Sequence, residues 1–117
     1  MLKFNGKKLF TKEGELLLPY SILEAIEIDN VIIVIYDYME FSNKKAAKNL
    51  VGLNTEGEQL WVARNPTGYP GDSTDAYTGF CEGHKVSKGS IGVCNYTGIF
   101  CEIGVSNGVI RNKVITK

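Results

Sequence analysis

The sequence predicts an all-β, antiparallel protein, and three observations lead to this prediction. Short turn signals recur along the chain, each flanked by β-branched or aromatic residues. The run Val31–Tyr36 is too rich in β-branched residues for a helix and is typical of a buried strand. The C-terminal half then repeats the same order of strands and turns. We expect two four-stranded units, at about 20–64 and 76–116, packed as a sandwich or a half-open barrel.

The N-terminal segment predicts a hairpin added to these two units. Asn5-Gly6 stands between Phe4 and Lys7, and both turn residues tolerate the positive φ of a type I′ turn. The chain has 117 residues, of which 44% are hydrophobic and 22% charged, which suits a single core. We expect one β domain over residues 1–117.

The stretch 21–37 has a helical alternative, because Ser21 followed by Glu24 is similar to a capping box. We favour a hairpin with its turn at Asp29-Asn30, since the β-branched run that follows needs a neighbouring strand. This hairpin predicts three cross-strand pairs: Ile28 with Val31, Ile26 with Ile33, and Glu24 with Ile35.

The remaining segments are assigned by their turn residues. Residues 37–49 are expected to form a loop with one helical turn around 44–48. The segment from Ala63 to Ala76 is rich in proline, glycine and hydroxyl residues, and predicts a long surface loop of the kind that often carries function. Further turns are predicted at Thr55-Glu56-Gly57, Lys88-Gly89, Thr97-Gly98 and Asn107-Gly108.

Composition argues against several classes of function. Thirteen basic and thirteen acidic residues cancel, so no net positive charge favours nucleic acid. The longest apolar run is far shorter than the roughly 20 residues that span a bilayer, and the first ten residues lack the apolar core of an export signal. We expect a cytoplasmic protein that binds neither nucleic acid nor membrane.

One hairpin resembles a known repeat. Leu53, Asn54, Gly57, Leu60 and Trp61 follow the pattern of the blade hairpins in quinoprotein-type β-propellers. The wider layout of the chain is similar to small bacterial proteins of about this length, and this resemblance implies no activity. Closing a propeller takes more blades than two units supply, so no quinone or other cofactor is expected.

Three cysteines lie in the C-terminal third, and their odd number favours reduced thiols. A turn at Thr97-Gly98 would place Cys94 opposite Cys101 as a buried thiol pair. Together with Cys81 and His84 they supply four possible zinc ligands, but Cys81 and His84 lie three positions apart and face opposite sides of a regular strand. We expect structural cysteines and no metal, with a disulfide or redox role as the alternative.

No catalytic constellation emerges from the remaining polar residues. Cys81 with His84 lacks a third orienting group, so a solvated histidine is the stronger interpretation. Asp72, Asp75 and Glu82 could hold a hard cation, but they do not follow the register of a calcium loop. We expect these carboxylates to be solvated.

Aromatic residues flank the long loop. Trp61, Tyr69, Tyr77 and Phe80 would form a stacking or anchoring surface if they shared one face. Trp61 is expected in the core, as tryptophans of blade hairpins generally are. Tyr69 is expected to be exposed.

The sequence therefore predicts a non-enzymatic binding domain with a protein partner, similar in size to immunity, antitoxin or adaptor proteins. Its predicted contact residues are Tyr69, Asp72 and Asp75, with Trp61 and Tyr77 as further binding candidates.

Two other functions stay open at this stage. A small-molecule binder or enzyme could use a cleft between the two sheets, lined by Trp61, Tyr77 and His84. Alternatively, uncovered strands at Val31–Tyr36 and Val109–Ile115 could pair two chains into a homodimer.

Overall fold

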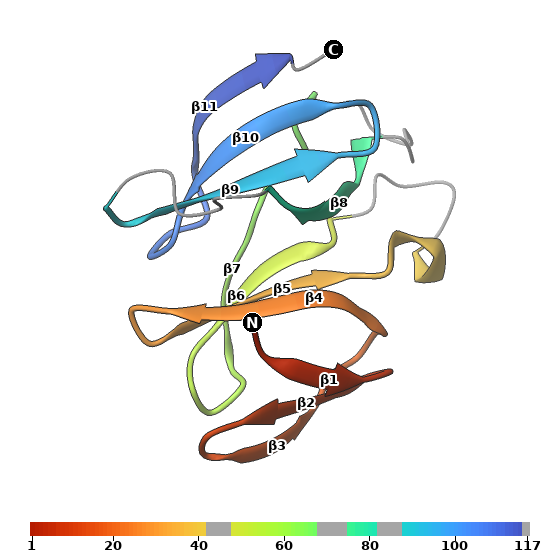
Figure 1. The fold of residues 1–117 in the computed structure, drawn as a ribbon, viewed down its shortest axis with the longest axis vertical. Helices are drawn as coiled ribbons and strands as arrows, with labels where there is room; N and C mark the ends of the chain where they lie inside the picture. Colours follow the sequence, from red (N-terminus) through yellow and green to blue (C-terminus); the bar gives the residue numbers. More distant parts are fainter. Residues whose placement is uncertain (42–47, 68–74, 82–87, 116–117) are drawn as a thin grey trace.

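The computed structural model describes residues 1–41, 48–67, 75–81 and 88–115. Within them, strands form three antiparallel sheets of three, four and four strands, none of which closes into a barrel (Figure 1). The predicted all-β fold and its two four-stranded units are confirmed. Among the described residues, no helix has the length and apolar character needed to cross a membrane.

Each sheet is a meander of strands that follow one another in the chain. The N-terminal sheet contains β1 (Lys3–Asn5), β2 (Lys8–Thr11) and β3 (Gly14–Leu17). The middle sheet contains β4 (Ile22–Ile28), β5 (Val31–Tyr36), β6 (Leu50–Leu53) and β7 (Gln59–Val62). The C-terminal sheet contains β8 (Tyr77–Phe80), β9 (Ser90–Asn95), β10 (Ile99–Gly104) and β11 (Ile110–Ile115). A short 3-10 helix, η1 (Tyr38–Glu40), follows β5.

The three sheets stack as layers along the long axis of the molecule, with the middle sheet buried on both faces (Figure 1). Strand β5 shows why. Ile33 and Ile35 pack into the core shared with the C-terminal sheet, while Ile32 and Val34 pack into the core shared with the N-terminal sheet. A strand buried on both faces reads as a continuous apolar run rather than an alternating one. Strand β5 is therefore central, and no second chain is needed to cover it.

The β4–β5 hairpin forms as predicted, and the helical alternative is wrong. All three predicted cross-strand pairs are present in its register. Asp29 and Asn30 have φ values of 52° and 64°, the positive values that a type I′ turn requires at both central residues. The strand pairing of β4 with β5 overrides the helical preference of its first residues.

The predicted turn at Asn5-Gly6 is wrong by one residue. Asn5 pairs with Lys8, so the turn residues are Gly6 and Lys7. This register places Phe4 opposite Leu9, which is fully buried. The predicted register would instead have faced Phe4 with a lysine, so burial of the apolar pair decides the turn. A third strand, β3, completes the hairpin into a sheet.

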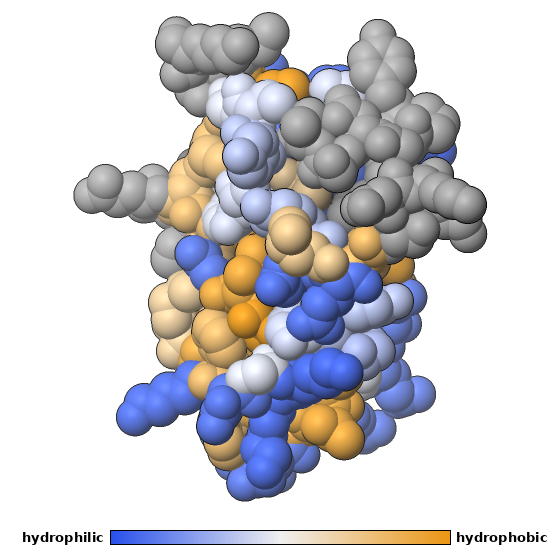
Figure 2. All heavy atoms as spheres, turned by 90° about the vertical axis from the view of Figure 1, so that its right-hand side faces the viewer, coloured by the Kyte–Doolittle hydropathy of each residue, from blue (hydrophilic) through white to orange (hydrophobic). Residues whose placement is uncertain are grey.

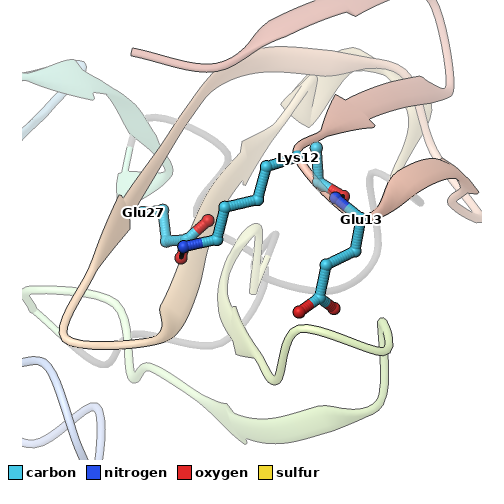
Figure 3. Close-up of polar contacts among 4 residues, drawn as sticks. Lys12, Glu13 and Glu27 are labelled. Atoms are coloured by element: carbon cyan, nitrogen blue, oxygen red, sulfur yellow. Dashed lines mark hydrogen bonds and ion pairs between the residues drawn. The ribbon is translucent and has the colours of Figure 1, made fainter.

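The N-terminal sheet is joined to the middle sheet by main-chain and charged contacts. The Leu2 amide donates to the Ala25 carbonyl at 2.9 Å. Figure 3 shows Lys12 reaching across to Glu27, at an N–O distance of 3.4 Å, while Glu13 points away. Figure 2 shows hydrophilic side chains gathered at the lower end of the molecule, over the N-terminal sheet. Exposed ion pairs contribute about 1 kcal/mol or less, so burial of residues such as Leu9 holds this layer.

The other predicted turns are found where the structure describes them. The Asn54 side chain accepts the amides of Glu56 and Glu58, both at 2.9 Å, and closes the β6–β7 turn. Turns also connect β9 to β10 and β10 to β11. Residues 44–47 of the predicted helical turn lie outside the described residues, as do residues 68–74 of the long loop.

Candidate functional site

Asn49 links the middle sheet to the C-terminal sheet. Its side chain is fully buried just before β6. The Nδ2 atom donates to the Tyr36 carbonyl at 2.9 Å and to the Tyr77 carbonyl at 2.7 Å, and Oδ1 accepts the Tyr77 amide at 3.1 Å. This side chain fixes the start of β8 against the middle sheet, so the two sheets are held at a defined distance.

Trp61 fastens the same two sheets at the other end. Its Nε1 atom donates to the Val105 carbonyl at 2.9 Å, and its side chain is only 8% exposed. The indole lies between Gly52 and Gly108, where a Cβ atom would approach its ring carbons to 2.2 Å and 2.3 Å. Only glycine leaves room for the ring at these two positions. Trp61 is thus part of the core, as its blade-hairpin context predicts.

A groove of about 570 Å³ lies beside Trp61, between the last strand of the middle sheet and the β10–β11 turn. One wall is formed by Val62 and residues 64–67, and the other by residues 107–110 and Lys113. In Figure 1, β7 rises steeply from the middle sheet towards the C-terminal sheet, which brings the end of β7 close to the beginning of β11. Tertiary packing, not sequence proximity, assembles this groove.

The groove is positively charged. Among the described residues, its lining contains two cationic side chains, Arg64 and Lys113, and no acidic side chain. Lys113 donates through Nζ to the Pro66 carbonyl at 2.9 Å and so spans the two walls. No ion pair of Arg64 occurs within the described part of the chain. A chain of zero net charge therefore concentrates positive charge at one site.

Asn65 lines the groove and carries an unsatisfied amide. The residue is 5% exposed, and both Nδ2 and Oδ1 are covered by neighbouring atoms. Neither atom has a hydrogen-bond partner among the described residues. Burying a polar group without a partner costs about 1–3 kcal/mol, and such groups are uncommon in folded proteins. Asn65 is therefore an unusual feature that stability alone does not explain.

One border of the groove is an open strand edge, because β7 is the last strand of the middle sheet. The Ala63 amide donates to the Leu50 carbonyl at 2.9 Å, so the main-chain groups of Val62 point away from β6. The side chains of Leu60, Val62 and Val109 are 50%, 40% and 55% exposed. Exposed apolar side chains and outward-pointing main-chain groups therefore lie next to the cationic lining of the groove.

Asp75, one of the predicted contact residues, supports the groove from the interior. It is 1% exposed, and its two carboxylate oxygens accept the Thr67 amide, each at 3.0 Å. Asn95 also donates to it at 3.3 Å. These bonds hold the end of the groove's first wall against the C-terminal sheet. The other two predicted contact residues, Tyr69 and Asp72, lie outside the described residues.

Tyr77 is fully buried in the core between the middle and C-terminal sheets. Its hydroxyl donates to the Arg64 carbonyl at 2.7 Å, directly behind the groove wall. Burial is the main cause that raises the pKa of this phenol above its ordinary value. Trp61 and Tyr77 therefore position the groove from within the core. His84, the third residue expected in the inter-sheet cleft, lies outside the described residues.

The prediction of reduced thiols is wrong for two of the cysteines. Cys81 and Cys94 form a disulfide with a Cα–Cα distance of 6.1 Å. The predicted Cys94–Cys101 pair does not form, because the β9–β10 turn is one residue longer than expected and Cys101 lies opposite Val93. Cys94 and Cys101 consequently face opposite sides of the sheet. The disulfide also uses two of the ligands that the zinc alternative required.

Cys101 is a buried free thiol. Burial raises its pKa to about 11, and a hydrogen bond with Tyr77 opposes that shift only in part. Nucleophilic cysteines need a stabilised thiolate, so Cys101 is a packing residue. No group of three or more histidine, cysteine or acidic side chains that could hold a metal occurs within the described ranges.

Sequence reasoning missed Arg64, Asn65 and Lys113. Arg64 and Asn65 begin the long loop in which the sequence predicts contact residues. No local pattern distinguishes these two residues from the rest of that loop. Lys113 lies almost fifty residues away on an edge strand, with no local feature that distinguishes it from other surface lysines. Only the stacking of the middle sheet against the C-terminal sheet brings the three residues to one groove.

Comparison with known proteins identifies a family for this chain. The chain matches no curated protein sequence. A family model described as a domain of unknown function, DUF7957, matches residues 1–115. Because this match covers nearly all of the 117 residues, the chain belongs to the DUF7957 family.

Proposed function

We propose that the protein is a non-enzymatic binding domain that receives a partner protein in the groove between its middle and C-terminal sheets. One observation carries this proposal: two cationic side chains and an unsatisfied buried amide converge on one groove. Binding surfaces often contain groups that destabilise the free protein. A bound ligand can compensate both for the unpaired buried amide and for the proximity of two like charges.

A protein partner fits the shape of the groove better than an enclosed ligand does. The groove is open along β7, where Leu60 and Val62 are exposed beside unpaired main-chain groups. Exposed apolar side chains next to an open strand edge are a common setting for protein recognition. We include in this proposal an immunity, antitoxin or adaptor role in a bacterial cytoplasm. We also include the likeness of the two four-stranded meanders to propeller blades.

A small-molecule ligand is the second candidate. The volume of about 570 Å³ falls in the range of roughly 300–1,000 Å³ that such sites occupy. The groove also lies between the two sheets, where the sequence placed a cleft. Under this alternative, Arg64 and Lys113 would bind an anionic group of the ligand.

Native mass spectrometry of the protein purified from its host tests the proposal. We expect a co-purifying polypeptide that is lost from the double variant Arg64→Glu/Lys113→Glu. The matched control is Lys3→Glu/Lys48→Glu, which makes the same change of charge at exposed lysines outside the groove. The control variant should retain the polypeptide.

The other outcomes are informative. A polypeptide that remains on the groove variant would place the binding surface elsewhere and overturn the proposal. A small mass that is lost only from the groove variant would establish the second candidate. A doubled mass that both variants retain would indicate a homodimer that forms away from the groove.

A further inference from the structure

We propose that the groove binds an extended, acidic peptide segment, which adds as a strand to the open edge of β7. This inference rests on the proposed function and names the chemistry of the partner. Four features of the described residues support it: the direction of the β7 main chain, the charge of the two walls, the amide of Asn65, and the use that the fold already makes of Asn49.

The β7 edge offers main-chain groups in the geometry of a strand. Hydrogen bonding of Ala63 to Leu50 leaves the amide and carbonyl of Val62 directed outward. No described strand pairs with this side of β7. In strand addition, main-chain hydrogen bonds supply affinity and alternate side chains supply specificity. Val62 is therefore the point at which an incoming segment would pair.

The walls select a negative side chain. Arg64 follows Val62 by two positions, so both residues face the groove from the same wall. Lys113 reaches in from the opposite wall, and its Nζ donates a hydrogen bond to the Pro66 carbonyl of the first wall. A carboxylate between the two cations would form charge-assisted hydrogen bonds, which are stronger than the lysine's bond to a neutral carbonyl. No acidic residue in the described part of the lining competes for these cations.

Asn49 shows how an asparagine binds a strand in this fold. Its side chain takes both the amide and the carbonyl of Tyr77, in place of a neighbouring strand. Asn65 has the same donor and acceptor, is also buried, and lacks any partner among the described residues. Both amide atoms are covered, so contact with a ligand requires the side chain to turn. If Lys113 leaves the Pro66 carbonyl to bind a carboxylate of the peptide, the wall next to Asn65 is released and the side chain can turn.

Binding to synthetic peptides tests the inference on the full-length protein. The probe is an array of blocked peptides of about eight residues, the length of a typical strand, with randomised flanks and a central Glu, Gln or Lys. Trp61, the single tryptophan, packs against Gly108 of the groove wall and reports occupancy by fluorescence. We expect the peptides with Glu to bind roughly tenfold or more tightly than those with Gln, and those with Lys not to bind.

Variants separate this inference from the proposed function. Arg64→Gln and Lys113→Gln should each reduce the preference for Glu over Gln, and Asn65→Leu should weaken all peptides alike. Lys3→Gln is the matched control and should change nothing. If the groove variants abolish binding but Gln and Glu peptides bind equally, the groove is the site and the acidic inference is wrong. If no peptide in the array binds, or if Asn65→Leu and Arg64→Gln bind the peptides with unchanged affinity and unchanged preference, both the inference and the groove's role in peptide binding are overturned.

Discussion

The side chain of Asn49 pairs with the main chain of Tyr77 as a neighbouring strand would, accepting its amide at 3.1 Å and donating to its carbonyl at 2.7 Å. This pair joins two sheets that share no strand-to-strand ladder in the described residues. Both groups of Tyr77 are buried, so loss of the asparagine removes a hydrogen-bond partner from each of them within the core.

Asn49→Ala should therefore lower the free energy of unfolding by about 3 kcal/mol or more, since it leaves several buried main-chain groups without partners. Urea denaturation followed by Trp61 fluorescence measures the change. The control is Asn112→Ala on the exposed edge strand β11, expected within about 0.5 kcal/mol of the native chain. Equal effects of the two substitutions would show that the Asn49–Tyr77 pair does not join the sheets.

The position of Trp61 predicts the cost of a methyl group at Gly108. Gly108→Ala combines a positive φ of 71° with a Cβ atom placed 2.3 Å from the indole. Gly6→Ala has a similar φ of 60° but nothing within 4 Å of its Cβ, so it isolates the cost of the backbone conformation. We expect about 1 kcal/mol for Gly6→Ala and at least about 3 kcal/mol for Gly108→Ala. A smaller loss at Gly108 than at Gly6 would contradict the packing of the ring.

Asn65→Leu should increase stability. Leucine has the same number and branching of side-chain heavy atoms as asparagine and removes a buried amide that has no partner among the described residues, so the free energy of unfolding should rise by about 1 kcal/mol. Chemical denaturation measures the change, with Asn112→Leu as an exposed control. A loss of stability in Asn65→Leu would mean that the amide is satisfied in the free protein. It would then no longer count as a reserved binding group.

The disulfide predicts a thiol count and a loss of stability on reduction. The denatured, unreduced protein should react as if it had one thiol, that of Cys101, and the reduced protein as if it had three. Replacing Cys81 and Cys94 with serine opens a loop with a sequence separation of 13, for which the chain-entropy estimate is about 3 kcal/mol. Protein isolated under thiol-blocking conditions that already shows three thiols would indicate a reducing compartment and a reduced native state.

Stability should fall at alkaline pH because burial raises the pKa values of Cys101, Tyr36 and Tyr77. The pKa of Cys101 is raised from 9.0 to about 11 and that of Tyr36 from 10.0 to about 12, in both cases chiefly by burial. A raised pKa in the folded state means that the folded chain holds its proton more tightly than the unfolded chain does. The resulting stability is complete below pH 9 and decreases as the pH rises through about 11 and 12.

Unfolding titrations between neutral and alkaline pH measure this dependence. Cys101→Ala should lose the part of the slope between about pH 9 and 11 and keep the part due to Tyr36. An unchanged slope in this variant would show that the thiol is not protected in the folded state.

Much of the fold follows from local sequence. Turn residues and β-branched runs determine where strands begin and end, and the β4–β5 register could be predicted pair by pair because a two-residue turn leaves one alignment. Where two registers were open, as at Asn5-Gly6, the choice depended on Leu9 reaching a core that the local sequence does not reveal. An error of one residue in the length of the β9–β10 turn likewise gave Cys101 the wrong cross-strand partner, and the Cys81–Cys94 disulfide was not predicted.

The sequence by itself determined the strand content and the two four-stranded units, since these depend on neighbours that are close along the chain. The tertiary structure alone decided the groove and the pairing of Asn49 with Tyr77, which lie 28 positions apart. Lys113 and Pro66 are 47 positions apart and meet only when the C-terminal sheet stacks against the middle sheet. Contacts at such separations depend on how sheets stack, and no local pattern of residues records that arrangement.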